Sequence, residues 1–237
     1  ATIIKAGYEL IDGRLFRASA VFDFTEKKID RHKTAIVRHG LSSPMKFLFN
    51  KGYLSGGYSV FDYGCGLGDD LAELHANGID AAGWDPNFRP DAELVNADIV
   101  NLGFVLNVIE DVPERIEALH NAFELADRLL IVSCMLISES KLAQMTQYKD
   151  GVITSRNTFQ KYYFQAELQL FIENILEKTV YFPSATIKPT KQAIAVIGHK
   201  RTFTKAYRSQ NKCIKKAIIK PALRNIKSKI NVHLNKP

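Results

Sequence analysis

The chain has 237 residues, 46% of them hydrophobic, so it is long enough to bury one substantial core and is not a disordered protein. The formal net charge of +7 is unevenly divided, because residues 199–237 carry twelve Lys or Arg and no Asp or Glu, which leaves −5 for residues 1–198. No apolar run approaches the roughly 20 residues that span a bilayer, and the first residues lack the pattern of a secretion signal.

Residues 1–30 are predicted to be an N-terminal extension. Within it, residues 8–17 have the pattern of a hairpin that turns at Asp12-Gly13. A basic cluster follows, made of His32, Lys33, Arg38 and His39. These residues contact a cofactor carboxylate, contact a phosphorylated substrate, or are only solvated. Ser42 or Ser43 with Pro44 then predicts the start of a helix that runs to about Leu54.

The stretch 60–70 is the most informative part of the chain. An apolar strand breaks there into three alternate glycines, Gly64, Gly66 and Gly68, and then into a helical pattern. Glycine tolerates positive φ and lets backbone N–H groups approach a bound molecule with no Cβ in the way. A strand-loop-helix unit places such a loop at the carboxyl edge of a parallel sheet. The pattern therefore predicts a loop that holds a nucleotide-like ligand, although an ordinary turn would have the same start.

Acidic residues around the glycines indicate which ligand this loop holds. A pyrophosphate favours the spacing G-x-G-x-x-G and a helix start free of negative charge. Here the spacing is G-x-G-x-G, Asp62 precedes it, and Asp69 and Asp70 open the helix. These acids suit a ligand with an ammonium, a sulfonium and a ribose, a combination that describes S-adenosylmethionine.

The following elements predict an α/β fold with a doubly wound, Rossmann-like, mostly parallel sheet. A second strand over 79–84 ends at Asp85, where a carboxylate can accept hydrogen bonds from both ribose hydroxyls. A strand that begins near Asp98 leads into a helix opened by residues 112–114, and residues 128–134 form the next strand. Residues 191–198 form the last strand, which is expected to be antiparallel to its neighbour.

The segment between Asp85 and Asp98 is too short for a full strand-helix unit and contains Pro86 and Pro90. The third strand is therefore predicted to be abbreviated, over 93–95. Asp98 has two interpretations: its carboxylate accepts a hydrogen bond from an adenine amine, or the residue only begins the next strand.

These spaced features together resemble the class I S-adenosylmethionine-dependent methyltransferases. The resemblance implies S-adenosylmethionine as the cofactor, a methyl acceptor as the substrate, and ribose binding by Asp85. It gives the following cofactor-binding set: Asp62, Tyr63, Gly64, Cys65, Gly66, Gly68, Asp85, Pro86, Asp98, Gly103, Phe104 and Asn107. Helix capping is an equal alternative for Asn107 and for Glu110. No catalytic residue is assigned, because this cofactor already carries an activated methyl group and asks mainly for positioning.

A closer resemblance is to the DNA phosphorothioation-associated methyltransferases. It rests on residues 31–36, 41–44, 61–66, 83–86, 101–111 and 158–163. The resemblance spans roughly residues 30–198 and implies a setting in DNA modification. Two departures are the extension ahead of residue 31 and the basic segment 199–237 in place of a longer second domain.

Residues 31–198 are thus the predicted methyltransferase domain, and residues 199–237 a basic amphipathic helical tail. In the tail Ile214, Ile218, Ala222, Ile226 and Ile230 recur every four residues between lysines and arginines. Such a helix docks on the acidic body, binds nucleic acid, or lies on a membrane surface.

Three functions stay open at this point: a methyltransferase with an unknown acceptor, a non-catalytic cofactor-binding regulator or subunit of a DNA modification or defence complex, and another enzyme on the same fold. The Asp/Asn/Ser-Pro-Pro-aromatic motif of amino-methylating DNA enzymes is absent, as is the Pro-Cys pair of cytosine C5 methylation. His75, His120 and His199 lack metal-ligand spacing, so no metal site is predicted. The three cysteines form no disulfide framework, which favours a reducing, cytoplasmic compartment.

Overall fold

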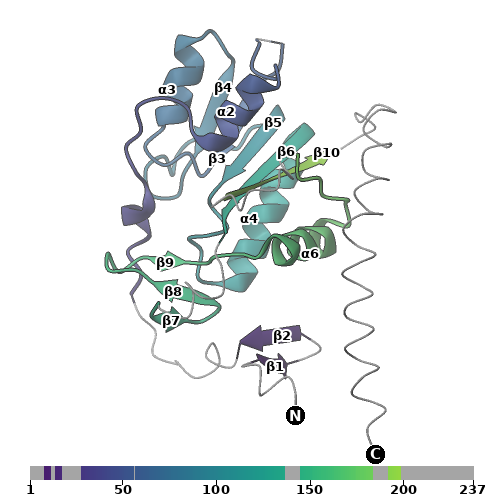
Figure 1. Cartoon of the computed structure of the whole chain (residues 1–237). Coiled ribbons are helices and arrows are strands. Elements are labelled where there is room, and N and C mark those ends of the chain that lie inside the picture. The colour runs from purple at the N-terminus through teal and green to yellow at the C-terminus, as the bar shows by residue number, and fades with distance from the viewer. Residues whose placement is uncertain are drawn as a thin grey trace, which may run out of the picture. The chain divides into compact units, whose positions relative to one another are not determined.

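A computed structural model describes residues 28–55, 57–136, 145–183 and 192–198, together with the backbone of residues 8–11 and 14–17. Its centre is a five-stranded sheet with the order β10-β6-β5-β3-β4 (Figure 1). The strands are β3 (Val60–Tyr63), β4 (Ala81–Trp84), β5 (Ala97–Gly103), β6 (Ala126–Met135) and β10 (Gln192–Gly198). The first four are parallel and β10 is antiparallel to β6. This confirms the predicted mostly parallel sheet with an antiparallel last strand.

Helices cover both faces of the sheet. Figure 1 shows α2 (Ser43–Asn50) and α3 (Asp69–Ala76) on one side, and α4 (Val112–Glu124) and α6 (Gln165–Leu176) on the other. The start of α4 follows from its sequence, because Asp111 accepts a 2.9 Å hydrogen bond from the backbone N–H of Glu114 and Pro113 needs no amide partner. The predicted doubly wound α/β architecture is confirmed.

The core lies between the sheet and α4 and α6. Strand β3 is buried along its whole length, as expected for a strand with both faces covered. Side chains of Phe61, Val100 and Leu130 meet those of Leu119 and Ile172 from the helices. This packing fixes the carboxyl ends of β3, β4 and β5 relative to one another.

The predicted third strand is wrong. Residues 93–95 belong to no strand, and the only pairing in the segment between β4 and β5 is a single bridge from Asp85 to Arg89. Two prolines in this short segment remove amide donors that a ladder would use. Within the described residues, β4 is therefore the last strand on this side of the sheet.

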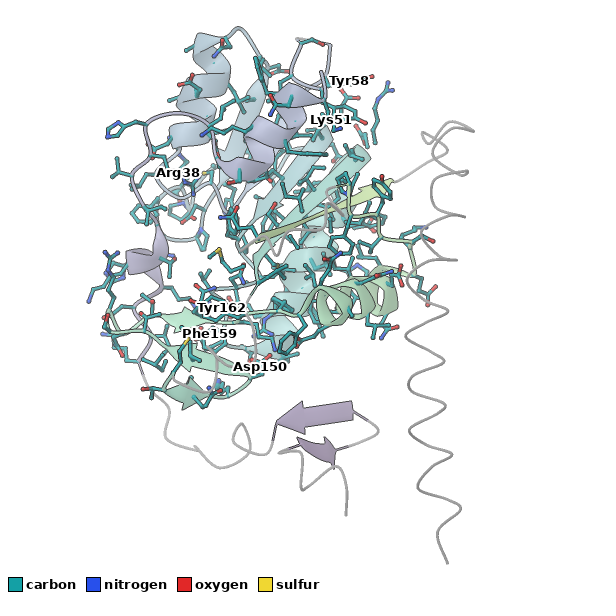
Figure 2. The ribbon with its side chains drawn as sticks, viewed as in Figure 1. Arg38, Lys51, Tyr58, Asp150, Phe159 and Tyr162 are labelled. Atoms are coloured by element: carbon teal, nitrogen blue, oxygen red, sulfur yellow. The ribbon has the colours of Figure 1, made fainter. Side chains whose placement is uncertain are left out.

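A small antiparallel sheet, which the sequence did not reveal, lies between β6 and α6 in the chain. It consists of β7 (Gln147–Tyr148), β8 (Gly151–Ile153) and β9 (Phe159–Gln160). The buried guanidinium of Arg115 on α4 donates to both carboxylate oxygens of Asp150, at 2.7 and 3.0 Å, and to the carbonyl of Ile109. Figure 2 labels Asp150 and Phe159, whose ring lies 5.8 Å from the same guanidinium. Arg115 thus fastens the small sheet to α4.

At the N-terminal end, β1 (Tyr8–Ile11) and β2 (Arg14–Arg17) pair antiparallel with Ile11 opposite Arg14, as the predicted hairpin requires. The 3₁₀ helix η2 (Arg31–Thr34) precedes α2. Contacts divide the chain into residues 1–199 and 200–237. The predicted basic tail, 199–237, lies outside the described residues. None of the described helices is long and apolar enough to cross a membrane.

Candidate functional site

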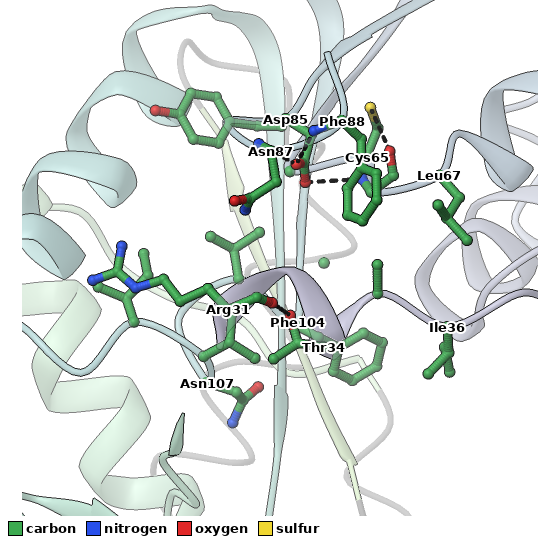
Figure 3. A pocket seen from close by; sticks show the side chains of 18 of the residues that line it. Arg31, Thr34, Ile36, Cys65, Leu67, Asp85, Asn87, Phe88, Phe104 and Asn107 are labelled. Carbon is green, nitrogen blue, oxygen red and sulfur yellow. Dashed lines mark hydrogen bonds between the residues drawn. The ribbon is translucent and has the colours of Figure 1, made fainter. Parts of the chain in front are cut away.

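A cleft of about 1010 Å³ opens at the carboxyl ends of β3, β4 and β5, and Figure 3 shows part of its lining. This is the edge at which open α/β sheets bind ligands. Nine of the twelve residues predicted to bind the cofactor line the cleft: Tyr63, Gly64, Cys65, Gly66, Asp85, Pro86, Gly103, Phe104 and Asn107. The structure does not bring Asp62, Gly68 and Asp98 into this lining.

The glycine loop joins β3 to α3 and has the backbone conformation that glycine alone adopts easily. Gly64 and Gly66 have φ of 83° and 56°. A Cβ on Gly64 would lie 2.3 Å from Cγ2 of Val105, and one on Gly66 would lie 3.4 Å from Cβ of Ala35. The loop is thus pressed closely between two other cleft segments, and its backbone lines the cleft without side chains. Gly68 is the residue before α3 and takes no part in the lining.

Asp85 follows β4 and lies directly opposite the glycine loop (Figure 3). Its Oδ2 accepts a 3.0 Å hydrogen bond from the backbone N–H of Gly66, and its Oδ1 accepts bonds of 2.9 and 3.1 Å from Asn87 and Phe88. The side chain is buried, with an exposed fraction of 9% for the residue. A carboxylate has about four acceptor positions, so one remains for a ligand hydroxyl while all three of these bonds persist.

Asp62 lies one layer below the cleft. Its Oδ1 accepts a 2.8 Å hydrogen bond from the amide of Asn101, and both residues are buried. Burial, aided by the nearby carboxylate of Asp70, raises the pKa of Asp62 to about 7. Asp62 is thus bonded to the neighbouring strand β5 and is not among the residues that line the cleft.

The acids that open α3 accept hydrogen bonds from the chain ahead of α2. Asp70 accepts a 2.7 Å hydrogen bond from the backbone N–H of Ser42 and lies 3.3 Å from the guanidinium of Arg38. Asp69 accepts a 2.6 Å bond from the backbone N–H of Arg38. Both carboxylates hold the chain segment ahead of α2, and Asp69 also lines the cleft.

That segment, residues 31–42, is called the strap below. It crosses the cleft wall with Thr34, Ala35 and Ile36 among the lining residues, and Figure 3 shows Thr34 and Ile36 there. At its first residue the guanidinium of Arg31 donates to both oxygens of Glu110, at 2.9 Å each, and to both oxygens of Glu114. The strap is therefore held at both ends by ion pairs and backbone hydrogen bonds.

No local sequence signal marks the partners of Arg31. The hydrogen bonds that Arg31 donates raise its pKa above the usual value, those to Glu114 most, even though burial opposes the shift. Glu110 does not cap α4, because Asp111 does. The capping alternative for Glu110 is therefore wrong.

The end of β5 contributes Gly103, and the loop after it contributes Phe104 and Asn107. Phe104 has φ of 64°, a conformation that is costly for a residue with a Cβ and that is found at ligand sites more often than elsewhere. The amide of Asn107 is used within the protein: its Oδ1 accepts a 3.0 Å bond from the backbone N–H of Met135, and its Nδ2 donates to the carbonyl of Lys161. Asn107 joins β6 to the small sheet, and it caps no helix.

Asp98 lies at the opposite edge of the sheet, near the amino end of β5. Its carboxylate accepts hydrogen bonds from Ser59, at 3.1 and 3.2 Å, and from Arg128 at 2.6 Å. Although partial burial opposes it, these bonds lower the pKa of Asp98. This position agrees with the interpretation in which Asp98 only begins the strand. Asp98 therefore does not belong to the cofactor-binding set.

Two ionisable side chains at the loop are poor proton acceptors. Burial raises the pKa of the Cys65 thiol to about 12, so this residue is protonated at neutral pH. Burial likewise raises the pKa of Tyr63, whose ring lies 5.2 Å from that of Trp84. Both residues shape the cleft and supply no base. Within the described residues, no three His, Cys, Asp or Glu side chains gather as a metal site would require.

The far wall of the cleft comes from the small sheet and was missed by sequence reasoning. It contains residues 154–156, Thr158 and Gln160. Its strands are two or three residues long, too short for a periodic pattern to show. The only sequence signal is the cluster of turn-forming residues between 154 and 158.

Comparisons with known proteins show the fold of the chain alone. No protein-family model and no curated protein matches the chain. Among solved structures, an O-methyltransferase family protein from Burkholderia thailandensis is 16% identical with a TM-score of 0.50; the match covers 68% of this chain and only 57% of that protein. The magnesium protoporphyrin IX methyltransferase of Synechocystis PCC 6803, with S-adenosylhomocysteine bound, is 16% identical over 72% of this chain and 94% of its own, with a TM-score of 0.46. The chain thus shares its Rossmann-like fold with a protein of a methyltransferase family.

Proposed function

We propose that the cleft binds S-adenosylmethionine and that the chain transfers the methyl group of this cofactor to an acceptor. The observation that carries the proposal is the pairing of the glycine loop with Asp85. The two elements follow neighbouring parallel strands, line one cleft, and are joined by the hydrogen bond between the N–H of Gly66 and Asp85. A backbone surface facing a buried carboxylate suits a nucleoside that carries a ribose diol and a positive charge.

The residues present fit this cofactor. Backbone at Gly64 and Gly66 lines the cleft where side chains would obstruct it, and the carboxylate of Asp85 retains one acceptor position for a ribose hydroxyl. A second hydroxyl would replace the bond from Gly66. Asn87 and Phe88, beside Asp85, and Phe104, after β5, would surround the base. The shared fold with an O-methyltransferase family protein supports this assignment.

The bound cofactor supplies a methyl group that its sulfonium already activates. The work left to the chain is to hold the acceptor in line and to exclude water. The strap is placed to cover the cofactor, since Ala35 packs against Gly66 and both ends of the strap are tied down. Cys65 and Tyr63 are protonated at neutral pH and do not take a proton from the acceptor.

The residues after β5 bear on the acceptor. Leu102-Gly103-Phe104 occupies the place where DNA amino-methyltransferases carry their Pro-Pro-aromatic motif. We therefore favour an acceptor other than the exocyclic amine of a DNA base.

A link to DNA modification is proposed on the sequence alone, from the resemblance described above and from the tail. Twelve cations without a counter-charge would bind phosphate in a strongly salt-dependent way. A variant with six tail Lys changed to Gln should then lose DNA retention at 50 mM salt. Equal retention of DNA by this variant and by the unchanged chain would contradict nucleic-acid binding by the tail.

The direct test is isothermal titration of the chain with S-adenosylmethionine and S-adenosylhomocysteine, with NAD and ATP as controls. Selective binding of the first pair supports the cofactor assignment, and binding of NAD or ATP instead contradicts it. Formation of S-adenosylhomocysteine during an acceptor screen then separates a methyltransferase from a non-catalytic cofactor-binding regulator. Release of methylthioadenosine instead would indicate a different group transfer.

A further inference from the structure

The far wall of the cleft ends in a tightly built turn, residues 154–158, at the tip of the hairpin formed by β8 and β9. The backbone N–H of Thr154 donates a 2.9 Å hydrogen bond to the carbonyl of Thr158, and the two threonine hydroxyls lie 2.6 Å apart. Asn157 adopts the left-handed conformation, with φ of 59°. These bonds fix the backbone of the turn, and with it the positions of Ser155 and Arg156.

The turn is also fastened to the chain ahead of the strap. The backbone N–H of Asp30 donates a 3.0 Å hydrogen bond to the carbonyl of Asn157, and the amide of Asn157 donates to the carbonyl of Lys28 at 2.8 Å. This turn and the start of the strap therefore form one corner of the cleft.

Arg156 presents a cation at this corner. It lines the cleft and is exposed, and its guanidinium has no hydrogen bond or ion pair among the described residues. Lys33 lines the same corner, where its Nζ lies 2.7 Å from Oδ2 of Asp30, an oxygen that is also 3.4 Å from Nδ2 of Asn157. Asp30 pairs with Lys33, and Arg31 is shared by the carboxylates of Glu110 and Glu114, so these charges leave no net positive excess. Arg156 is the cation at this corner that has no carboxylate partner among the described residues.

The cleft has room for a second molecule beside the cofactor. Its volume of about 1010 Å³ lies at the upper end of the roughly 300–1,000 Å³ of single-ligand pockets. All predicted cofactor-binding residues in the lining belong to the carboxyl ends of β3 and β5 or to the loops after β3, β4 and β5, and none belongs to the 154–158 turn. The corner therefore faces the part of the cleft that the cofactor leaves free.

We propose that Arg156, assisted by Lys33, binds an anionic group, carboxylate or phosphate, of a small-molecule acceptor. A guanidinium presents paired N–H donors that match the oxygens of both groups, and a fixed turn lowers the cost of ordering it. The identification of the anion as part of the acceptor rests on the proposed function; the anion site itself does not.

The test is a titration of ¹⁵N-labelled protein with benzoate, phenyl phosphate and neutral benzamide, with and without S-adenosylhomocysteine. Benzoate or phenyl phosphate should bind about ten-fold more tightly than benzamide and should shift the amide signals of residues 154–158. The better of the two anions tells whether carboxylate or phosphate is the natural group. Arg156→Gln should lose the preference and Arg156→Lys should keep part of it, because lysine provides a point charge without the paired donors.

Lys149→Gln is the matched control. This residue lies at the other turn of the same small sheet, its Nζ is 5.7 Å from the ring of Tyr148, and it does not line the cleft. The preference for the anion should survive this change. Equal binding of benzoate, phenyl phosphate and benzamide, or a preference that persists in Arg156→Gln, would overturn the anion site. Failure of S-adenosylhomocysteine to bind would count against the proposed function alone, since the probes are also titrated without it.

Discussion

The backbone N–H of Gly66 donates a 3.0 Å hydrogen bond to Oδ2 of Asp85, and this bond makes one unit of the loop after β3 and the acid after β4. The two residues are 19 positions apart in the chain, so neither the glycine loop nor the strand-end acid requires the other locally. Because β3 and β4 pair in parallel, with Tyr63 opposite Trp84, their carboxyl ends meet and the unit forms. Asp85 is thereby oriented before any ligand arrives.

Replacing Asp85 by Asn should weaken binding of S-adenosylhomocysteine by about 10- to 100-fold, because hydrogen bonds to a charged partner contribute about 1.5–3 kcal/mol. Calorimetric titration measures the change. Asp98→Asn is the control, since the structure places this acid at the opposite edge of the sheet, and its affinity should equal that of the unchanged chain. A similar loss in both variants would contradict the assigned site.

Gly64→Ala should destabilise the fold by about 2–4 kcal/mol. The new Cβ would lie 2.3 Å from Cγ2 of Val105, and the residue would keep a φ of 83° that alanine adopts at a cost. Urea unfolding measures the loss. The double variant with Val105→Ala should recover the part that comes from the clash and leave the part that comes from φ. An unchanged free energy of unfolding in Gly64→Ala would show that the loop is not held in this conformation.

The features that the sequence predicted well depend on short stretches of chain. The start of α4 was predicted at residues 112–114, where it lies, and the glycine loop was placed after β3. In both cases the determining residues are adjacent: a proline in the first turn of the helix, and alternate glycines after a buried strand. Local patterns of this kind survive in the folded chain because nothing in the tertiary structure opposes them.

What the sequence missed depends on contacts between distant residues. The bonds from Arg31 to Glu110 and Glu114 span about eighty positions in the chain, and no periodicity reports them. Asp98 was misplaced because an acid at the start of a parallel strand lies at the amino edge of the sheet, whereas ligands bind at the carboxyl edge. Strand direction separates these two cases once the start of β5, at Ala97, is known.

Arg31→Gln should release S-adenosylhomocysteine about ten-fold faster with little change in the association rate, because the change removes the ion pairs that hold one end of the strap. Stopped-flow displacement gives both rate constants. Arg128→Gln is a suitable control, because it also removes an ion pair, the one with Asp98, but lies outside the strap and the cleft lining. If Arg31→Gln and the unchanged chain release the ligand at the same rate, the strap does not gate the cleft.

The buried acid Asp62 should make stability depend on pH. Burial raises its pKa from 3.8 to about 7, so between pH 4 and pH 7 the folded chain holds a proton at this site that the unfolded chain has lost. Stability therefore falls as the pH rises through this window and changes no further, from this group, above pH 7. Asp62→Asn keeps an oxygen that accepts the bond from Asn101 and carries no titratable group. The contribution of this position to the free energy of unfolding should therefore not depend on pH. Denaturant unfolding of both proteins at several pH values should show the variant gaining stability relative to the unchanged chain from pH 4 to pH 7, by an amount of the order of 1–4 kcal/mol. A difference between the two proteins that stays constant over that range would mean that Asp62 is ionised throughout and that the fold contains a buried charge.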